Sequence, residues 1–445
     1  MLRFGTDGVR GVANAELTPE LALALGRVAA RVLGGDRFAI GRDTRRSGPL
    51  LEAALAAGLA GEGADVTLLG VAPTPEVAWW SAREDAPAAV VSASHNPFAD
   101  NGIKLFSAGG RKLPDAVEER LEAELGALLG GGDGRSAPTG AGVGTITSTD
   151  AHAGYGAAVA AALDGRRLDG LRAVVDCANG AASVVAPDVL RSLGVDVTVI
   201  HGSPDGTNIN DGCGSTHPGD LQRAVVGQGA DLGIAFDGDA DRVLLVDASG
   251  ELVDGDHLIA VCAIDRHARG ALADDTVVVT VMTNLGFRLA MDARGISVVE
   301  TAVGDRYVLE ALDAGGYSLG GEQSGHVVFP ALATTGDGLL TAVQVLDVVV
   351  RSGTPIGELA AGAMTRLPQV LRNVEVARRD PAILERIAPA VAAVESRLGD
   401  KGRVLVRPSG TEPLVRVMVE APTEADAAAA ADELVRAVES AAAKG

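Results

Sequence analysis

One pattern recurs along this chain and limits what it can fold into: a short run of Val, Ile, Ala and Leu ends in a polar or glycine-rich loop. Continuous apolar runs of four to six residues are typical of strands that are buried on both faces. The stretches are RFAIGRDTRRSG (37–48), AAVVSASHNP (88–97), LRAVVDCANG (171–180), LGIAFDGDADR (232–242), TVVVTVMTN (276–284), YSLGGEQSGH (317–326) and GRVLVRPSGTEP (402–413).

Helical stretches lie between these runs. Residues 18–33 begin with Thr18 as a candidate N-cap, 115–129 are amphipathic, and 423–443 open with a capping-box-like pair, Thr423 and Asp426. Strands that alternate with helices predict an α/β fold. Ligands bind beyond the carboxyl ends of strands in such sheets, so the polar loops are expected to line one or more clefts.

The length of 445 residues alone predicts roughly three domains of about 150 residues each. A glycine-rich stretch (130–144), a turn-rich stretch (247–256) and the start of a last unit (366–376) suggest the boundaries. We therefore expect four units. They are 1–150 with the serine loop (SASHNP, 92–97), 151–250 with the aspartate loop (DGDADR, 237–242), 251–365 with GEQSGH, and a smaller unit, 366–445, with RPSGTEP.

Composition argues against several classes of protein. The net charge of −21 and an aromatic share of 3% disfavour a nucleic-acid partner, which needs a positive surface or stacking platforms. The three cysteines lie far apart, which disfavours disulfides and structural zinc and fits a reducing cytoplasm. No apolar run is long enough for a membrane span, and the N-terminal residues lack a secretory pattern.

The aspartates of FDGDADR are the strongest single signal. Asp237, Asp239 and Asp241 follow an apolar run at alternate positions, so their carboxylates can converge on one point. Clustered carboxylates repel one another unless a cation joins them, and hard oxygen ligands favour Mg²⁺ or Ca²⁺. An EF-hand is rejected, because Arg242 and Ala248 stand where Gly and Glu are needed. A solvated acidic turn is the alternative. Magnesium usually leaves positions open for phosphate oxygens, which suggests a phosphate ligand.

Two further loops could recognise a sugar phosphate. Arg407 offers a planar fork for phosphate, and Ser409, Gly410 and Thr411 offer hydroxyl and backbone N–H donors. In GEQSGH, polar side chains alternate between two glycines, which suits sugar hydroxyls; they are Glu322, Ser324 and His326. An ordinary turn is the alternative for both loops.

The stretch SASHNPFADNGIK leaves its chemistry open. Ser92 and Ser94 stand two apart at a strand exit, and His95 is next to Ser94. No Gly-x-Ser-x-Gly elbow surrounds them, so a hydrolase is unsupported, and the residues alone do not choose between the serines. Lys104 is either an acid or base with a lowered pKa or a surface lysine. P-loop, dinucleotide-binding and HExxH motifs are absent from the sequence.

Together these motifs resemble the α-D-phosphohexomutase family over essentially the whole chain. The resemblance rests on six motifs in the family's order: GTDGVRG (5–11), SASHNP (92–97), DNGIK (100–104), DGDADR (237–242), GEQSGH (321–326) and RPSGTEP (407–413). It implies four domains around a central cleft, three of them α/β with mixed sheets flanked by helices. The fourth is a smaller C-terminal α+β lid.

The resemblance also implies a role for each site residue. Ser94 would carry the phosphoryl group and, with the three aspartates, would bind one Mg²⁺. Lys104 and His326 would act as acid and base, with Arg10 and Arg242 lining the site. Sugar hydroxyls and the phosphate that is not transferred would be held by Glu322, Ser324, Arg407, Ser409, Gly410 and Thr411.

The start LRFGTDGVRG, the GEQSGH form and TTGDG (334–338) look most like family members that act on glucosamine phosphate. The implied reaction converts glucosamine 6-phosphate to glucosamine 1-phosphate in the cytoplasm, through a 1,6-bisphosphate that also serves as activator, and feeds UDP-N-acetylglucosamine and cell-wall precursors. The implied partner is a small sugar phosphate, without nucleic acid or membrane, and a homodimer is compatible. Mannose or glucose phosphate as substrate, a non-catalytic sugar-phosphate sensor and a Mg²⁺ phosphatase remain alternatives.

Overall fold

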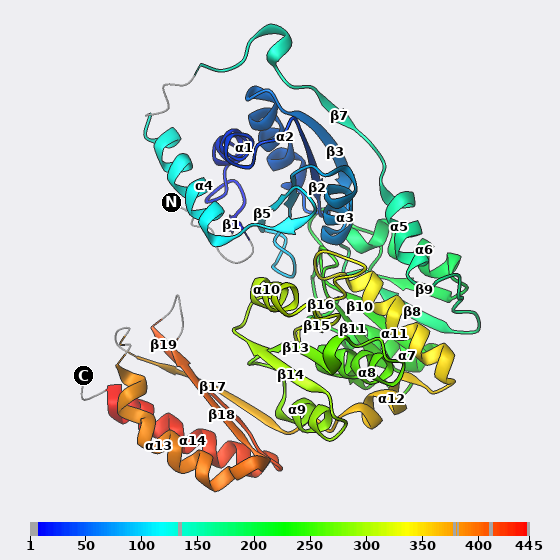
Figure 1. The fold of residues 1–445 in the computed structure, drawn as a ribbon, viewed down its shortest axis with the longest axis vertical. Helices are drawn as coiled ribbons and strands as arrows, with labels where there is room; N and C mark the ends of the chain where they lie inside the picture. The colour runs from blue at the N-terminus through cyan, green and yellow to red at the C-terminus, as the bar shows by residue number, and fades with distance from the viewer. Residues whose placement is uncertain (1–7, 132–135, 377–379, 381, 409–412, 443–445) are drawn as a thin grey trace. The chain divides into compact units, whose positions relative to one another are not determined.

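The computed structural model describes residues 8–131, 136–376, 380, 382–408 and 413–442. The chain forms two compact units, one of residues 1–282 with 296–363 and one of residues 283–295 with 364–445. In the described residues the first unit contains three mixed sheets, and the second contains one antiparallel sheet (Figure 1).

The first sheet of the larger unit carries the serine stretch. Its order is β1 (Val9–Val12), β5 (Asp100–Ser107), β4 (Ala88–Val91), β2 (Arg37–Arg42), β3 (Asp65–Val71) and β7 (Ile146–Ser148), with β6 (Arg111–Lys112) on β5. The helices of this region are α1 (Pro19–Leu33), α2 (Gly48–Gly61), α3 (Thr74–Glu84) and α4 (Asp115–Leu129). Val90 and Val91 are fully buried in different core clusters. β4 is therefore buried on both faces, as its apolar run predicts.

The second sheet carries the aspartate loop. Its order is β12 (Leu252–Val253), β11 (Val243–Asp247), β10 (Leu232–Phe236), β8 (Arg172–Asp176) and β9 (Asp196–Ile200), and its helices are α5 (His152–Ala161), α6 (Ala186–Ser192) and α7 (Gly219–Gln228). β8 pairs in parallel with β9 and β10, whereas β11 runs antiparallel to β10. The turn between β10 and β11 is the stretch from Asp237 to Arg242.

The third sheet has the order β14 (Ser297–Thr301), β13 (Thr276–Thr280), β15 (Gly320–Gly321) and β16 (Val327–Val328). Its helices are α8 (Gly255–Ala268), α10 (Asp305–Gly315), α11 (Gly338–Ser352) and α12 (Ile356–Ala363). The GEQSGH loop joins β15 to β16. Among the described residues no single helix is long and apolar enough to cross a membrane; only α11 and α12 together, bent by 97°, reach that length and hydropathy.

The smaller unit contains β17 (Gln369–Glu375), β19 (Leu414–Glu420) and β18 (Arg403–Pro408), in that spatial order. Its helices are α9 (Leu285–Asp292), α13 (Ile383–Leu398) and α14 (Glu424–Ala442). Figure 1 shows α13 and α14 lying together along this sheet. The capping prediction at Thr423 is confirmed, since its Oγ1 accepts a hydrogen bond from the Asp426 N–H at 3.1 Å.

A buried carboxylate begins α11 and makes the stability of this region depend on pH. Asp337 Oδ1 accepts the Leu340 N–H at 2.8 Å, and Tyr155 Oη donates to the same carboxylate at 2.9 Å. Burial raises the pKa of Asp337 from 3.8 to about 6. Because the folded state then holds this proton more tightly than the unfolded state, Asp337 costs stability as the pH rises from about 4 to about 6.

We expect Asp337→Asn to remove that cost and keep the helix cap, because Asn caps helices as well as Asp does. The variant should gain up to about 3 kcal/mol over the wild type between pH 4 and pH 7. Thermal unfolding across this pH range measures the difference. Asp292→Asn, at an exposed position, is the control and should follow the wild type. A constant difference between Asp337→Asn and the wild type at all pH values would contradict the prediction.

Candidate active site

The serine loop and the aspartate loop meet at the carboxyl ends of β4 and β10. Ser94 Oγ donates a hydrogen bond of 2.6 Å to Asp237 Oδ2, and both residues are buried. A side chain at Gly238 would come within 2.5 Å of the Ser94 carbonyl oxygen, so only glycine allows the two loops to lie this close. Ser94 adopts φ of +52°, a left-handed conformation that is uncommon for serine and that clusters at functional sites.

The structure distinguishes the two serines that the residues alone left equivalent. Ser92 is fully buried, and its Oγ donates to Asp43 Oδ2 at 2.6 Å. Ser92 Oγ also accepts a hydrogen bond from the Ser94 N–H at 2.9 Å. Ser92 therefore supports the loop, whereas Ser94 directs its hydroxyl at the acidic group.

A buried arginine that the sequence analysis did not single out holds the serine loop. Arg45 has no exposed surface; its Nε donates to Asp43 Oδ2 at 2.8 Å. Its Nη2 donates to the carbonyl oxygens of Ser94 at 2.9 Å and Asn96 at 2.8 Å, and its Nη1 donates to that of Asp100 at 3.0 Å. The guanidinium thus cross-links both ends of the serine loop. The only sequence signal was RDTRRSG, in which three arginines look alike.

Replacing Arg45 should therefore be far more costly than replacing its neighbour. We expect Arg45→Leu to lower the free energy of unfolding by about 3–5 kcal/mol, because it leaves the Asp43 carboxylate buried without its counter-charge. Arg46 is exposed, so Arg46→Leu should cost less than about 0.5 kcal/mol. Urea denaturation of the two variants measures the difference, and equal midpoints would refute the cross-linking role.

The three aspartates converge as predicted. One oxygen from each of Asp237, Asp239 and Asp241 lies within 4.8 Å of the others, and all three residues are buried. Burial and the two neighbouring carboxylates raise the pKa of Asp237 well above its usual value. Burial also opposes ionisation of Asp239, but Lys104 and the Thr74 hydroxyl hold its pKa below the usual range.

Two oxygens of this group that lack a hydrogen bond from the described residues fit a hard cation. Among the described residues, Asp239 Oδ1 and Asp241 Oδ1 are buried without a hydrogen-bond partner. Leaving buried acceptors unsatisfied is costly unless a ligand pairs with them. With Ser94 Oγ beside them, the donor set consists of oxygen atoms alone, which Mg²⁺ prefers. A solvated acidic turn, the alternative interpretation, is wrong because these side chains are buried.

Lys104 lies on β5 and is 4% exposed, so it is not a surface lysine. Its Nζ is 2.8 Å from Asp239 Oδ2 and 3.2 Å from Asp241 Oδ2. The ammonium therefore balances part of the negative charge of the aspartate group. This places a proton-carrying group beside two carboxylates of the group whose third member, Asp237, accepts the Ser94 hydroxyl.

Positive side chains lie near His95, the neighbour of Ser94. The Arg242 N–H donates to Asp237 Oδ1 at 3.2 Å, and Arg242 Nη1 lies 3.4 Å from His95 Nδ1. Burial, followed by the charges of Arg242 and Arg10, lowers the pKa of His95. His95 Nδ1 lies 3.3 Å from Ser94 Oγ. As a neutral ring, His95 therefore supports the position of the Ser94 hydroxyl.

The GEQSGH loop is tied to the aspartate loop. The Val243 N–H, directly after Arg242, donates to the Gly325 carbonyl oxygen at 3.1 Å. Glu322 Oε1 accepts the Gly304 N–H at 3.1 Å, and Ser324 Oγ is buried without a hydrogen-bond partner among the described residues. His326 is 1% exposed. The larger unit thus brings the serine, aspartate and GEQSGH loops together.

Arg407 belongs to the smaller unit, where it faces Arg416 across the β18–β19 pair. Burial and the charge of Arg416 lower the pKa of Arg407. Two guanidinium groups at neighbouring positions form a local excess of positive charge that suits an anion. The predicted partners Ser409, Gly410 and Thr411 lie outside the described residues.

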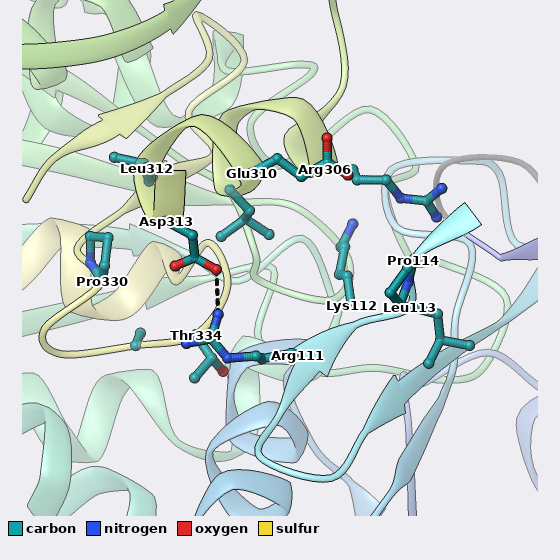
Figure 2. A pocket seen from close by; sticks show the side chains of 12 residues that line it. Arg111, Lys112, Leu113, Pro114, Arg306, Glu310, Leu312, Asp313, Pro330 and Thr334 are labelled. Atoms are coloured by element: carbon teal, nitrogen blue, oxygen red, sulfur yellow. Dashed lines mark hydrogen bonds and ion pairs between the residues drawn. The ribbon is translucent and has the colours of Figure 1, made fainter. Parts of the chain in front are cut away.

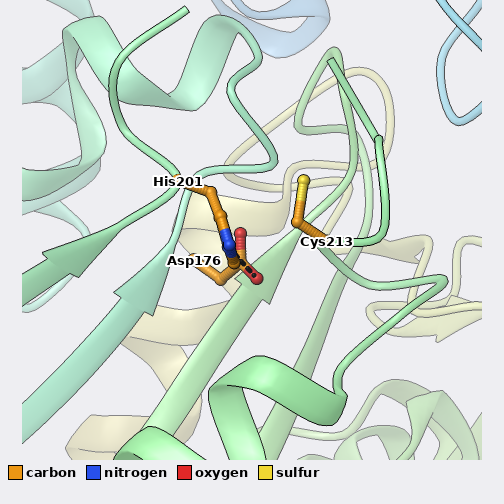
Figure 3. Close-up of side chains that lie close together, drawn as sticks. All are labelled: Asp176, His201 and Cys213. Carbon is orange, nitrogen blue, oxygen red and sulfur yellow. Dashed lines mark hydrogen bonds and ion pairs between the residues drawn. The ribbon is translucent and has the colours of Figure 1, made fainter. Parts of the chain in front are cut away.

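A second group of metal-ligating side chains lies at the carboxyl end of β8 (Figure 3). His201 Nδ1 is 3.0 Å from Asp176 Oδ2, and the Asp176 carboxylate accepts the N–H groups of Ala178 at 2.8 Å and Gly214 at 2.9 Å. Burial raises the pKa of the Cys213 thiol to about 12. Since the carboxylate is already hydrogen-bonded and the thiol stays protonated, we assign this group a role in fixing the loops.

Family models for phosphoglucomutase/phosphomannomutase match four successive parts of the chain. The α/β/α domains I, II and III match residues 1–128, 153–250 and 254–367, and the C-terminal domain matches residues 371–437. The chain belongs to the phosphoglucomutase/phosphomannomutase family. The predicted fold class of three α/β domains and a smaller C-terminal domain is confirmed, and the exact limits drawn from the sequence stay a prediction.

Relatives within this mutase family are similar over nearly their whole length. A phosphoglucosamine mutase of Frankia alni is 57% identical, with 98% of each chain covered. A phosphoglucosamine mutase of Rhodococcus opacus is 56% identical, with 98% of this chain and 99% of the relative covered.

Solved structures of the mutase family share the fold. A phosphoglucomutase/phosphomannomutase family protein from Burkholderia thailandensis has a TM-score of 0.80 at 25% identity, covering 98% of this chain and 97% of its own. An Aspergillus fumigatus N-acetylphosphoglucosamine mutase, solved with GlcNAc-6P and magnesium, has a TM-score of 0.67 at 20% identity, covering 99% and 96%.

Proposed function

We propose that this chain interconverts glucosamine 6-phosphate and glucosamine 1-phosphate by carrying a phosphoryl group on Ser94. The observation that carries the proposal is the 2.6 Å hydrogen bond from Ser94 Oγ to Asp237 Oδ2, within a buried group of three carboxylates. A hydroxyl beside a cation site is suited to phosphoryl transfer. The choice of glucosamine phosphate rests on relatives at 57% and 56% identity that are phosphoglucosamine mutases.

In the first half-reaction, phosphorylated Ser94 donates its phosphoryl group to the O1 hydroxyl of glucosamine 6-phosphate. The bond between phosphorus and Ser94 Oγ breaks as the bond between phosphorus and O1 forms. A base takes the O1 proton, and an acid protonates Ser94 Oγ. The resulting 1,6-bisphosphate turns over in the site, and its 6-phosphate returns to Ser94 by the same exchange.

Lys104 and His326 are the acid and base in this proposal. The role of Lys104 is supported by its position 2.8 Å from Asp239 and 3.2 Å from Asp241. These two carboxylates cluster with Asp237, which accepts the Ser94 hydroxyl. His326 is supported by its place at the end of the GEQSGH loop. In the same loop, Glu322 and Ser324 bind sugar hydroxyls, while Arg242 and Arg10 line the site.

Asp237, Asp239 and Asp241, with the phosphate on Ser94, would hold Mg²⁺. When bound, Mg²⁺ neutralises charge on the phosphoryl group during transfer. Arg407, with Ser409, Gly410 and Thr411, would hold the phosphate that stays on the sugar. A hexose 1,6-bisphosphate, such as the glucosamine form, would activate the enzyme by loading Ser94.

Peptide mass spectrometry and a substrate comparison test the proposal. We expect phosphate on Ser94 and faster isomerisation of glucosamine 6-phosphate than of glucose or mannose 6-phosphate, each assayed with a trace of its bisphosphate. Equal rates on the three sugars would refute the glucosamine preference. Release of inorganic phosphate in step with substrate consumption would indicate a phosphatase instead.

A further inference from the structure

The start of α10 is joined directly to the GEQSGH loop. The Gly304 N–H donates to Glu322 Oε1 at 3.1 Å, and the next residue, Asp305, places Oδ2 3.5 Å from His326 Nε2. The side chain of His326 is 1% exposed and that of Asp305 is 8% exposed. A carboxylate is thus buried against the histidine that the proposed function uses, and the sequence analysis did not single it out.

The position of the His326 ring is tightly limited. A side chain at Gly336 would lie 2.3–2.5 Å from three ring atoms, so the ring packs directly against the Gly336 backbone. Among the described residues, neither ring nitrogen has a hydrogen-bond partner. Asp305 Oδ2 is a charged atom that faces this buried ring at 3.5 Å. At 3.5 Å, Asp305 Oδ2 is close enough to pair with the facing nitrogen when the ring carries a proton there.

Asp305 is itself fixed by the first α/β region. Its carboxylate contacts Lys112 Nζ, and Lys112 lies on β6, which pairs with β5, the strand of Lys104. The adjacent Arg306 contacts Asp115 at the start of α4. Figure 2 shows Lys112 and Arg306 among the side chains that line one pocket. The carboxylate is therefore held from two sides, by α10 and by β6.

The geometry points to Asp305 as a positioning residue for His326. Resting on the proposed function, we infer that the Asp305 carboxylate holds the orientation of the His326 ring during proton transfer. Lys112 keeps the carboxylate in place. An ion pair that only links the two α/β regions would explain the contact between Asp305 and Lys112. It would not explain why the same atom, Asp305 Oδ2, also faces His326 Nε2.

The first test compares matched Asp→Asn variants of the full-length protein. We expect Asp305→Asn to lower kcat roughly tenfold to a hundredfold, less than the roughly hundredfold to ten-thousandfold that the acid or base itself contributes, with KM for glucosamine 6-phosphate changed by less than about threefold. Asp305→Glu, which keeps the charge, should recover part of kcat. Asp313 lies on the same helix and pairs with Arg111 at an exposed site (Figure 2), so Asp313→Asn should stay within about twofold of the wild type.

A double-mutant cycle with His326→Gln separates positioning from structural support. If Asp305 acts through His326, Asp305→Asn should lower kcat by less than about twofold in the His326→Gln background. Thermal unfolding shows whether each variant is folded, and Asp305→Ser replaces Asp305→Asn if the latter is not. Equal losses of kcat in both backgrounds, or an effect of Asp305→Asn equal to that of Asp313→Asn, would overturn the inference.

Two further outcomes separate this inference from the proposed function. Full activity of His326→Gln would remove the acid or base role of His326, and with it the role of Asp305, while isomerisation through Ser94 would stand. Asp305→Asn would show direct binding of the sugar amine by Asp305 if it raised only the KM for glucosamine 6-phosphate and left the KM for glucose 6-phosphate unchanged. That result would also overturn the positioning role.

Discussion

Ser94→Ala should abolish isomerisation, lowering kcat by at least about a thousandfold, as loss of an essential nucleophile does. The phosphoryl group needs an oxygen acceptor at this point, and Ser94 Oγ is the hydroxyl directed at Asp237. Steady-state assays measure the loss, and peptide mass spectrometry should find no phosphate on residues 92–97. Retained isomerisation, or phosphate transferred to Ser92, would refute the role of Ser94 as carrier.

Ser92→Ala is the matched control two residues away. It removes the hydrogen bond to Asp43 and the acceptor for the Ser94 N–H. We expect phosphate to remain on Ser94, with stability lowered by about 1–3 kcal/mol, because a buried donor and acceptor lose their partner. The contrast between the two variants isolates the chemistry of Ser94 from the support of its loop.

The strand-end loops were predictable from the sequence because each rests on a local pattern. The apolar runs before Ser92 and Asp237 form β4 and β10, and the polar residues that follow lie at the carboxyl ends of those strands. The alternation of Asp237, Asp239 and Asp241 was enough to predict their convergence. Such features depend on residues close together in the chain, so the sequence displays them directly.

Features that depend on distant residues were not predictable in the same way. Arg45 is one of three similar arginines, and only the fold brings its guanidinium to the carbonyl oxygens of the serine loop. Asp305 does not belong to a recognisable motif. Its inferred role follows from its contacts with His326 and Lys112, which only the fold reveals. The choice between Ser92 and Ser94 likewise depends on their hydrogen bonds to Asp43 and Asp237. These aspartates lie in the loops after β2 and β10.

The aspartate group should make activity depend on a divalent cation, and Asp239→Asn should weaken the binding of that cation. Asp239 Oδ1 is buried without a partner among the described residues, while its Oδ2 receives Lys104 at 2.8 Å and the Thr74 hydroxyl at 2.7 Å. Replacing one carboxylate by an amide removes a negative charge from the proposed Mg²⁺ ligands and from beside Lys104. We expect kcat to fall by roughly a hundredfold to a thousandfold, the order seen when one transition-state-stabilising group is removed, and half-activation to need more Mg²⁺.

Thr74→Val separates the carboxylate from its hydrogen bond. This nearly isosteric change removes the hydroxyl that donates to Asp239 Oδ2 but leaves all three carboxylates in place. Its effect on the Mg²⁺ concentration for half-activation should therefore be smaller than that of Asp239→Asn, about threefold or less. Chelation should inactivate the wild type, and added Mg²⁺ should restore it. If activity survives chelation, or if Asp239→Asn and Thr74→Val respond to Mg²⁺ as the wild type does, the Oδ1 atoms of Asp239 and Asp241 do not bind a catalytic cation.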